Sequence, residues 1–371
     1  MSIAYSGPNG GTMISAVFVS YRSAGLARAA IESFRSEAAR LAEPAEVIVV
    51  VTSEDPSERD SLAPHADRAI LTPRNAGFSG GLNAGLEAAR GEVLFLANPD
   101  ILFLPGSVAE LRDAVAGREP VAAGPAFFSD EGAALFQPPA DEPHPFELVR
   151  RRLGRSSGAA GRLFRRDLRR ALAARAAAVS GARVPATALR GALVATNRRT
   201  IDLVGPFDEG YRLYYEENDW QRRLRHLKGR LVYAGGAHVV HLYNQSARTE
   251  PRAGGWFAAS ERRYFLSHFG ESGRRALEAL RSSPEADGEP RLEEFGDARL
   301  RLRHPRAGET PVAVSPSSAF RPVLLAGIPA GELSWQPGTE VREAMRGSRW
   351  FARAFEPDTL ETLAEGELPA G

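Results

Sequence analysis

Short apolar runs alternate with helix-like segments along the first hundred residues. Residues 14–21 (ISAVFVSY) and 47–51 (VIVVV) are apolar and β-branched, as expected of strands buried on both faces of a parallel sheet. Two further strands are expected at 68–71 (RAIL) and 93–97 (VLFLA). Between the first two runs, apolar residues recur at helical spacing, and a second helix is expected around 82–89. This alternation predicts a doubly wound α/β sheet, in which ligands bind beyond the carboxyl ends of the strands.

A basic segment covers residues 141–183. It interleaves leucines with arginines at positions 150, 151, 152, 155, 162, 165, 166, 169, 170 and 175. The pattern predicts an amphipathic helical insertion. Two interpretations stay open: a solvated arginine-rich surface, or a helix that lies on an anionic membrane surface as a peripheral contact.

The C-terminal region differs from the rest of the chain. Residues 282–290 (SSPEADGEP) are linker-like, and short runs such as PVAVS and RPVLLAG then alternate with Pro and Gly. We therefore expect a disordered tail at 1–13, a catalytic domain at 14–275 and a small β-rich domain at 283–371. For that last domain, a carbohydrate-binding module and a module that makes a homo-oligomer both stay open.

Composition narrows the chemistry. The formal net charge of +1 gives no strong field, so nucleic acid is not an expected partner. There is no cysteine, which excludes zinc-thiolate sites and thiol nucleophiles, so any metal must be held by carboxylate, imidazole or amide groups. The polar first twelve residues do not have the pattern of a signal peptide, and no apolar run has the length of a membrane span. A cytoplasmic location is expected.

Three segments carry candidate chemistry. The first, 71–91, is glycine-rich and leads into a helix, where a tight turn and helix amides suit an anion. In the second, Asp100 follows a buried strand within Asn98-Pro99-Asp100 and is a candidate ligand for Mg²⁺ or Mn²⁺. Each segment also has a purely structural interpretation, as a turn before a helix or as a cap.

The third segment crowds acids before a predicted helix. Glu216, Glu217 and Asp219 fall within four positions, which suits a general base whose pKa is adjusted by its neighbours. Acids at this place also stabilise a helix N-terminus. His238 and His241 follow a predicted strand, and a histidine downstream of an acidic cation site is a candidate ligand.

With these residues in order, residues 14–270 resemble the family-2 glycosyltransferases, and within them the bacterial rhamnosyltransferase-like enzymes of cell-surface polysaccharide synthesis. The similar segments are Val19-Ser20-Tyr21, Arg74-Asn75-Ala76-Gly77 with Asn83, Asn98-Pro99-Asp100, Gly191-Ala192 before Gly205-Pro206-Phe207-Asp208-Glu209, Tyr215-Glu216-Glu217-Asn218-Asp219, and His241 with Ser246.

The resemblance implies a GT-A fold and a metal-dependent, inverting transfer of a sugar from a nucleoside diphosphate to a glycan or lipid-linked glycan. Glu217 takes the place of the catalytic base, with Glu216 and Asp219 beside it, and Asp100 and His241 that of metal ligands. Acceptor contacts are expected from Gly191, Ala192 and Trp220. Donor contacts are expected from Ser20, Tyr21, Ser53, Glu54, Arg74, Asn75, Gly77, Asn83 and Asn98.

One position departs from the family pattern. Where the family places an aspartate that contacts the nucleotide base, this chain has Val51, followed by Glu54 and Asp55 as substitutes. Two alternatives therefore stay open beside the transferase: a sugar-phosphate nucleotidyltransferase, and a non-catalytic sugar- or partner-binding protein that keeps the fold.

Overall fold

The computed structural model describes residues 12–149, 159–242, 252–282, 299–316, 323–339, 341–342 and 349–368. The chain forms two compact units, one of residues 1–126, 139–145 and 177–279 and the other of residues 127–138, 146–176 and 280–371. Residues 146–176, expected as an insertion in the first domain, thus group with the C-terminal residues. Of the tail expected at 1–13, residues 1–11 lie outside the described residues, and Met13 is buried.

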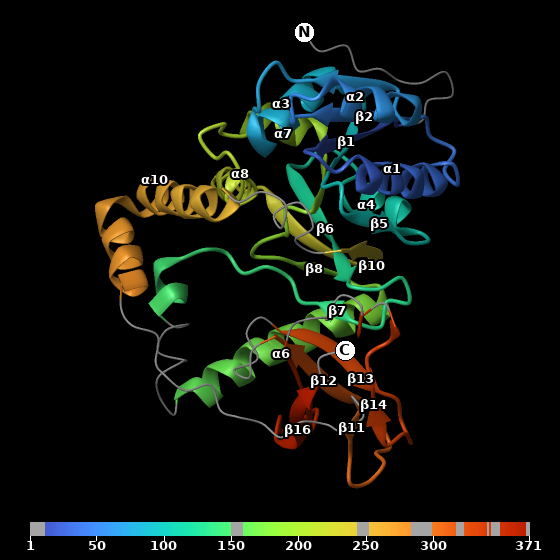
Figure 1. The fold of residues 1–371 in the computed structure, drawn as a ribbon, viewed down its shortest axis with the longest axis vertical. Coiled ribbons are helices and arrows are strands. Elements are labelled where there is room, and N and C mark those ends of the chain that lie inside the picture. The colour runs from blue at the N-terminus through green and yellow to red at the C-terminus, as the bar shows by residue number, and fades with distance from the viewer. Residues whose placement is uncertain are drawn as a thin grey trace. The chain divides into compact units, whose positions relative to one another are not determined.

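The first unit is built on a largely parallel sheet (Figure 1). Four parallel strands lie in the order β3 (Arg68–Leu71), β2 (Ala45–Val51), β1 (Ile14–Ser20) and β4 (Val93–Ala97), and β9 (Leu193–Asn197) adds antiparallel to β4. The strand order reverses between β1 and β4, which is where ligands of doubly wound sheets bind. The predicted fold class, a GT-A type α/β sheet with a β-rich C-terminal region, is confirmed.

Successive side chains of each strand point to opposite faces of the sheet, and helices cover both of these faces. Val17 and Val19 of β1 belong to an apolar cluster with α3 (Gly77–Ala88) and α8 (Glu216–His226). Between them, Phe18 points to the opposite face and packs edge-on against Phe34 of α1 (Ala24–Ala38), with ring centroids 6.2 Å apart.

A long strand near the end of this unit pairs with two strands from its middle. β10 (Arg230–His241) pairs antiparallel with β5 (Ile101–Phe103) and β8 (Arg183–Pro185). The remaining elements of the unit are α2 (Pro56–Leu62), η1 (Ala63–His65), α4 (Ser107–Ala114), β6 (Val121–Phe128), which runs into the second unit, α7 (Arg198–Val204) and α10 (Ala253–Ser282), which is kinked at Gly270.

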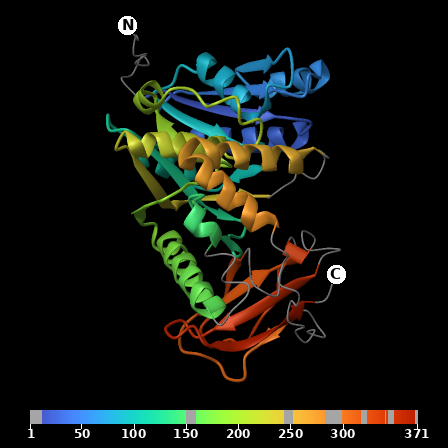
Figure 2. The same cartoon turned by 90° about the vertical axis from the view of Figure 1, so that its left-hand side faces the viewer.

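The second unit is mostly antiparallel β structure with one long helix (Figure 2). Its sheet runs β16 (Thr362–Leu368), β15 (Trp350–Phe355), β12 (Thr310–Ser315), β13 (Leu324–Ile328), β7 (Phe136–Gln137), and β11 (Leu300–Arg301) pairs with β14 (Ser334–Trp335). Helix α6 (Ala159–Ser180) is joined to it by Arg175, whose guanidinium donates to Glu309 at 2.6 and 2.8 Å. Within the described ranges, no helix combines the length and hydropathy of a membrane span.

Candidate active site

A cavity of about 370 Å³ opens at the carboxyl ends of β1, β2 and β4. Tyr21 and Thr52 follow β1 and β2, and Asp100 follows β4. Glu217 of α8 and His241 of β10 also line the cavity and add titratable side chains to its wall. The sheet topology alone brings these segments together, because parallel strands end at the same edge.

Asp100 and His241 are separated by 141 positions but are neighbours in space. In the β10–β5 pairing His241 stands opposite Ile101, and the Leu242 N–H donates to the Asp100 carbonyl at 2.9 Å. Their side chains are nearly buried, and Nε2 of His241 lies 3.7 Å from Oδ1 of Asp100. That distance is too long for a hydrogen bond.

The same distance suits two ligands of one cation. Oxygen and nitrogen atoms each about 2.1 Å from Mg²⁺ in octahedral geometry are roughly 3 Å apart when adjacent and 4 Å when opposite. Burial, aided by the positive charge of Arg190, lowers the pKa of His241 to about 3, so its imidazole is neutral and able to bind a metal at pH 7. The described residues contain no group of three His, Cys, Asp or Glu suited to a metal.

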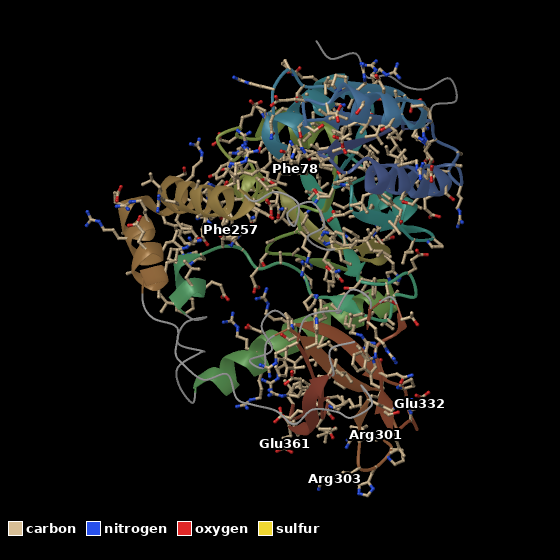
Figure 3. All side chains as sticks on the ribbon, viewed as in Figure 1. Phe78, Phe257, Arg301, Arg303, Glu332 and Glu361 are labelled. Atoms are coloured by element: carbon tan, nitrogen blue, oxygen red, sulfur yellow. The ribbon has the colours of Figure 1, made fainter. Side chains whose placement is uncertain are left out.

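The acids of α8 are presented by a strained turn. Tyr214 and Tyr215, directly before Glu216, have φ of 67° and 70°, values that a side chain with a Cβ rarely adopts. Helix α10 holds this turn: the Tyr215 hydroxyl donates to Glu261 at 2.7 Å, and the ring of Phe257, labelled in Figure 3, packs edge-on against both tyrosines. Such strain is common where a turn aims functional groups into a site.

Glu216 is buried and Glu217 is half-buried, and one carboxyl oxygen of each is out of contact with solvent. Both line the cavity, and Oε2 of each accepts no hydrogen bond from the described residues. Burial raises the pKa of Glu217, while burial and the charge of Glu217 raise the pKa of Glu216 well above its usual value. A second negative charge beside the first is disfavoured, so the two carboxyl groups lose their protons at different pH values.

Gly191 and Ala192 shape the wall of the cavity through other residues. A Cβ built on Gly191 would lie 2.9 Å from Cγ and 3.0 Å from Cδ of Glu217, so the glutamate chain lies directly on this glycine. The Ala192 carbonyl accepts from the Asn98 N–H at 2.8 Å, which fixes the segment that carries Asp100. Both line the cavity, where acceptor contacts were expected, and both also position the candidate catalytic groups.

The glycine-rich turn lines the cavity with Asn75, Gly77 and Phe78. Gly77 has φ +70°, and a Cβ there would lie 2.4 Å from the Arg212 carbonyl oxygen. The first helix amides are already used, because Gly77 N–H donates to Asn75 Oδ1 and Phe78 N–H donates to the Arg212 carbonyl. The anion site expected at this helix start therefore lacks these two donors.

Several predicted donor-binding residues do not line the cavity. The Asn83 amide bonds both the N–H and the carbonyl of Phe207 at 2.9 Å, joining α3 to the segment before α8. Arg74 is exposed, and Glu54 accepts from the Asn75 N–H at 2.6 Å. Ser20 and Ser53 donate their hydroxyls to Glu58.

Two predicted residues of α8 also point elsewhere. Trp220, expected to contact the acceptor, is 1% exposed, stacks on Phe207 at 5.5 Å and donates to the Gly205 carbonyl, because its side chain faces the core. Asp219 is paired with Arg223 at 2.9 Å and with His268 at 2.8 Å, which lower its pKa. Asp219 thus anchors α8 to α10 rather than lining the cavity.

The sequence pattern missed part of the cavity wall. Arg190, Arg212, Tyr214 and Trp256 line it, and the Arg212 guanidinium lies over the Trp256 ring at 4.8 Å. None belongs to a spaced motif; only the packing of α10 against the turn before α8 could have revealed them. Ser246, part of the late His–Ser pattern, lies outside the described residues.

The N-terminal part of the chain is similar in sequence to a known family. Residues 15–169 match the model of glycosyl transferase family 2, and this match covers less than half of the chain. Asp100 lies within the match, whereas Glu217 and His241 lie beyond it.

Solved structures with a similar fold include three glycosyltransferases. They are GalNAc-T7 with UDP, GalNAc and Mn²⁺ (12% identity, 98% of this chain and 73% of that chain, TM-score 0.46), the mannosyltransferase PcManGT from Pyrobaculum calidifontis with GDP-Man and Mn²⁺ (14%, 75% and 76%, 0.41), and the catalytic domain of Drosophila β1,4-galactosyltransferase 7 with xylobiose (9%, 65% and 74%, 0.39). These values are too low to bear on substrate or mechanism. No curated protein matches the sequence.

Proposed function

We propose that the protein is a metal-dependent, inverting glycosyltransferase. It moves a sugar from a nucleoside diphosphate to a hydroxyl of a glycan or lipid-linked glycan. The observation that carries this proposal is that one cavity holds the half-buried carboxyl group of Glu217 together with the buried Asp100–His241 pair. These are the two parts that the reaction needs: a proton acceptor and a means of holding a diphosphate.

Asp100 and His241 would hold Mg²⁺ or Mn²⁺ together with the donor's diphosphate oxygens. A bound divalent cation neutralises charge that develops on the departing diphosphate. His241, which is neutral, and Asp100 would supply one nitrogen and one carboxylate side chain to such a cation. Arg190, which also lines the cavity, adds a fixed positive charge near this end.

Glu217 takes the proton of the acceptor hydroxyl. The hydroxyl oxygen bonds to the anomeric carbon as the bond from that carbon to the diphosphate oxygen breaks, and the leaving group keeps the electron pair. Glu216 lies beside it, and burial and the charge of Glu217 raise the pKa of Glu216 well above its usual value, so the ionisation of one carboxyl group disfavours that of the other. A base with a pKa raised towards the working pH is efficient in proton transfer.

The acceptor would enter along the wall formed by Tyr214 and Trp256. Aromatic rings at a cavity wall provide apolar surface for the face of a sugar ring, with Arg212 at the rim to hold polar groups. A deoxyhexose such as rhamnose as the donor sugar, and cell-surface polysaccharide as the product, are proposals that rest on the sequence resemblance.

We also propose an electrostatic contact between α6 and an anionic membrane surface. Leu168 and Ala171 are buried, so the apolar side of α6 is used in packing at these positions. The exposed side carries four arginines within two helical turns: Arg165, Arg166, Arg169 and Arg170. Positively charged side chains within about a Debye length of an anionic bilayer are attracted to it.

The test of the transferase proposal is donor turnover by a Glu217→Gln variant. With Mn²⁺ and a panel of nucleoside diphosphate sugars, we expect wild-type protein to release nucleoside diphosphate. The variant should lose at least 100-fold in kcat while its donor affinity stays within threefold. Glu87→Gln, which changes an exposed acid on α3, should match wild type. Wild-type turnover in Glu217→Gln would refute the assignment, and release of pyrophosphate would indicate a nucleotidyltransferase.

A further inference from the structure

A buried carboxylate on α2 organises the cavity end formed by β1 and β2. Glu58 is 7% exposed and receives four hydrogen bonds. Its Oε1 accepts from the Ser20 hydroxyl at 2.6 Å and the Ser23 N–H at 2.9 Å. Its Oε2 accepts from the Arg22 N–H at 3.0 Å and from the Ser53 hydroxyl. Two carboxylate oxygens offer about four acceptor positions, so the carboxylate has none left for a ligand.

These bonds join the loops that follow two neighbouring strands. Ser20 is the last residue of β1, Arg22 and Ser23 belong to the turn between β1 and α1, and Ser53 belongs to the turn between β2 and α2. Tyr21 lies between two of the anchored residues and Thr52 is adjacent to a third, and both line the cavity. Arg22 has φ 53°, so the bond to its N–H also holds a strained backbone.

No other acid after β2 takes the place of a base-contacting aspartate. The side chain of Val51 is fully buried. Glu54 accepts from the Asn75 N–H, and Asp55 caps α2 by accepting from the Ser57 N–H at 2.9 Å. The wall at this end of the cavity therefore consists of the Tyr21 ring and the Thr52 side chain, without a carboxylate directed at a ligand.

We infer that Glu58 is a positioning residue for the donor nucleotide, holding Tyr21 and Thr52 as an uncharged wall for the nucleobase. This inference rests on the proposed function. A carboxylate that accepts from the ring N3–H of uracil would reject cytosine, whose N3 is itself an acceptor, by about 10⁴-fold or more. The Thr52 hydroxyl is uncharged and already donates to the Ser20 carbonyl at 3.4 Å, so it offers a nucleobase at most one neutral hydrogen bond, which changes affinity by about tenfold. The wall should therefore discriminate only weakly between uracil and cytosine.

The experiment measures binding of UDP, CDP and inorganic pyrophosphate to the full chain with Mn²⁺ by calorimetry. For wild type we expect Kd values of UDP and CDP within tenfold of each other. In Glu58→Gln an NH₂ group replaces one carboxylate oxygen. This group cannot accept a hydrogen bond, so at least one of the groups bonded to Glu58 loses its acceptor. The Kd values of UDP and CDP should both rise about tenfold, by the same factor for each. Pyrophosphate, which lacks the base, should bind within twofold of wild type.

Two further variants complete the test. Asp55→Asn, an acid of the same segment that only caps α2, should leave all three affinities within twofold. If Glu58→Gln does not fold, Ser53→Ala removes one of the four donors and should weaken the nucleotides about threefold but not pyrophosphate.

Three outcomes would overturn the inference: wild-type nucleotide affinity in the folded Glu58 or Ser53 variant, a UDP to CDP ratio above 100, or equal loss of pyrophosphate binding. Failure of wild type to bind any of the three ligands would instead reject the proposed function itself, and the inference with it.

Discussion

Gly191→Ala tests whether the position of Glu217 sets the rate of transfer. The new Cβ would lie 2.9 Å from Cγ, 3.0 Å from Cδ and 3.2 Å from Cβ of Glu217. Carbon atoms in contact are at least about 3.5 Å apart, so the glutamate must move by about 0.6 Å (3.5 − 2.9). The φ of Gly191 is not in the left-handed region, so alanine fits the backbone and the change acts on the side chain alone.

The expected cost follows from catalytic geometry. A displacement of 1 Å costs about 100-fold in rate, so a shift near 0.6 Å should lower kcat by about tenfold. The donor KM should stay within threefold, because Asp100 and His241 are anchored by the β10–β5 pairing rather than by Gly191. The assay is release of nucleoside diphosphate from the donor sugar with Mn²⁺, at saturating and at low donor concentrations.

Gly25→Ala is the matched control. It adds the same methyl group in the first turn of α1, where a Cβ meets nothing within 4 Å. This control should keep wild-type kinetics, and its melting temperature should rise slightly because alanine favours a helix. If folded Gly191→Ala turns over within twofold of wild type, either Glu217 is not the base or its placement does not limit the reaction.

Four further outcomes follow from the structure. The pH profile of kcat/KM should fall on the acid side with a midpoint above 4.5, because burial raises the pKa of Glu217; a midpoint at the ordinary value would contradict this role. The raised pKa of Glu216 means that ionising it destabilises the folded protein as the pH rises above 4.5. Glu216→Gln should therefore melt at a higher temperature than wild type at pH 8, and the difference should vanish near pH 4. Asn83→Ala should cost about 2 kcal/mol in denaturant unfolding because the Phe207 backbone groups lose their partners, and an unchanged midpoint would deny that link. Replacing the exposed arginines of α6 by Gln should abolish sedimentation with phosphatidylglycerol vesicles at low salt, which wild type should show and phosphatidylcholine vesicles should not; equal sedimentation of both proteins would reject the contact made by Arg165, Arg166, Arg169 and Arg170.

The sequence by itself determined the sheet and the segments that carry the chemistry. Runs such as 47–51 and 93–97 can only be buried strands, and a parallel order places their following residues at one edge. Asp100 and Glu217 were therefore identifiable as cavity residues from local pattern and family resemblance. The same pattern could not tell which neighbours in a short motif face inward: Trp220 follows Glu217 by three residues, yet it is in the core.

Tertiary structure decided what depends on contacts between distant segments. The pairing of β10 with β5 sets His241 beside Asp100, and the packing of Gly191 on Glu217 explains a glycine that the motif alone assigned to the acceptor. The role of Glu58 was invisible in the sequence, since its four donors come from loops up to 38 positions away. Hydrophobic periodicity encodes which face of an element is buried, whereas hydrogen-bond partners across loops depend on distances that only the folded chain defines.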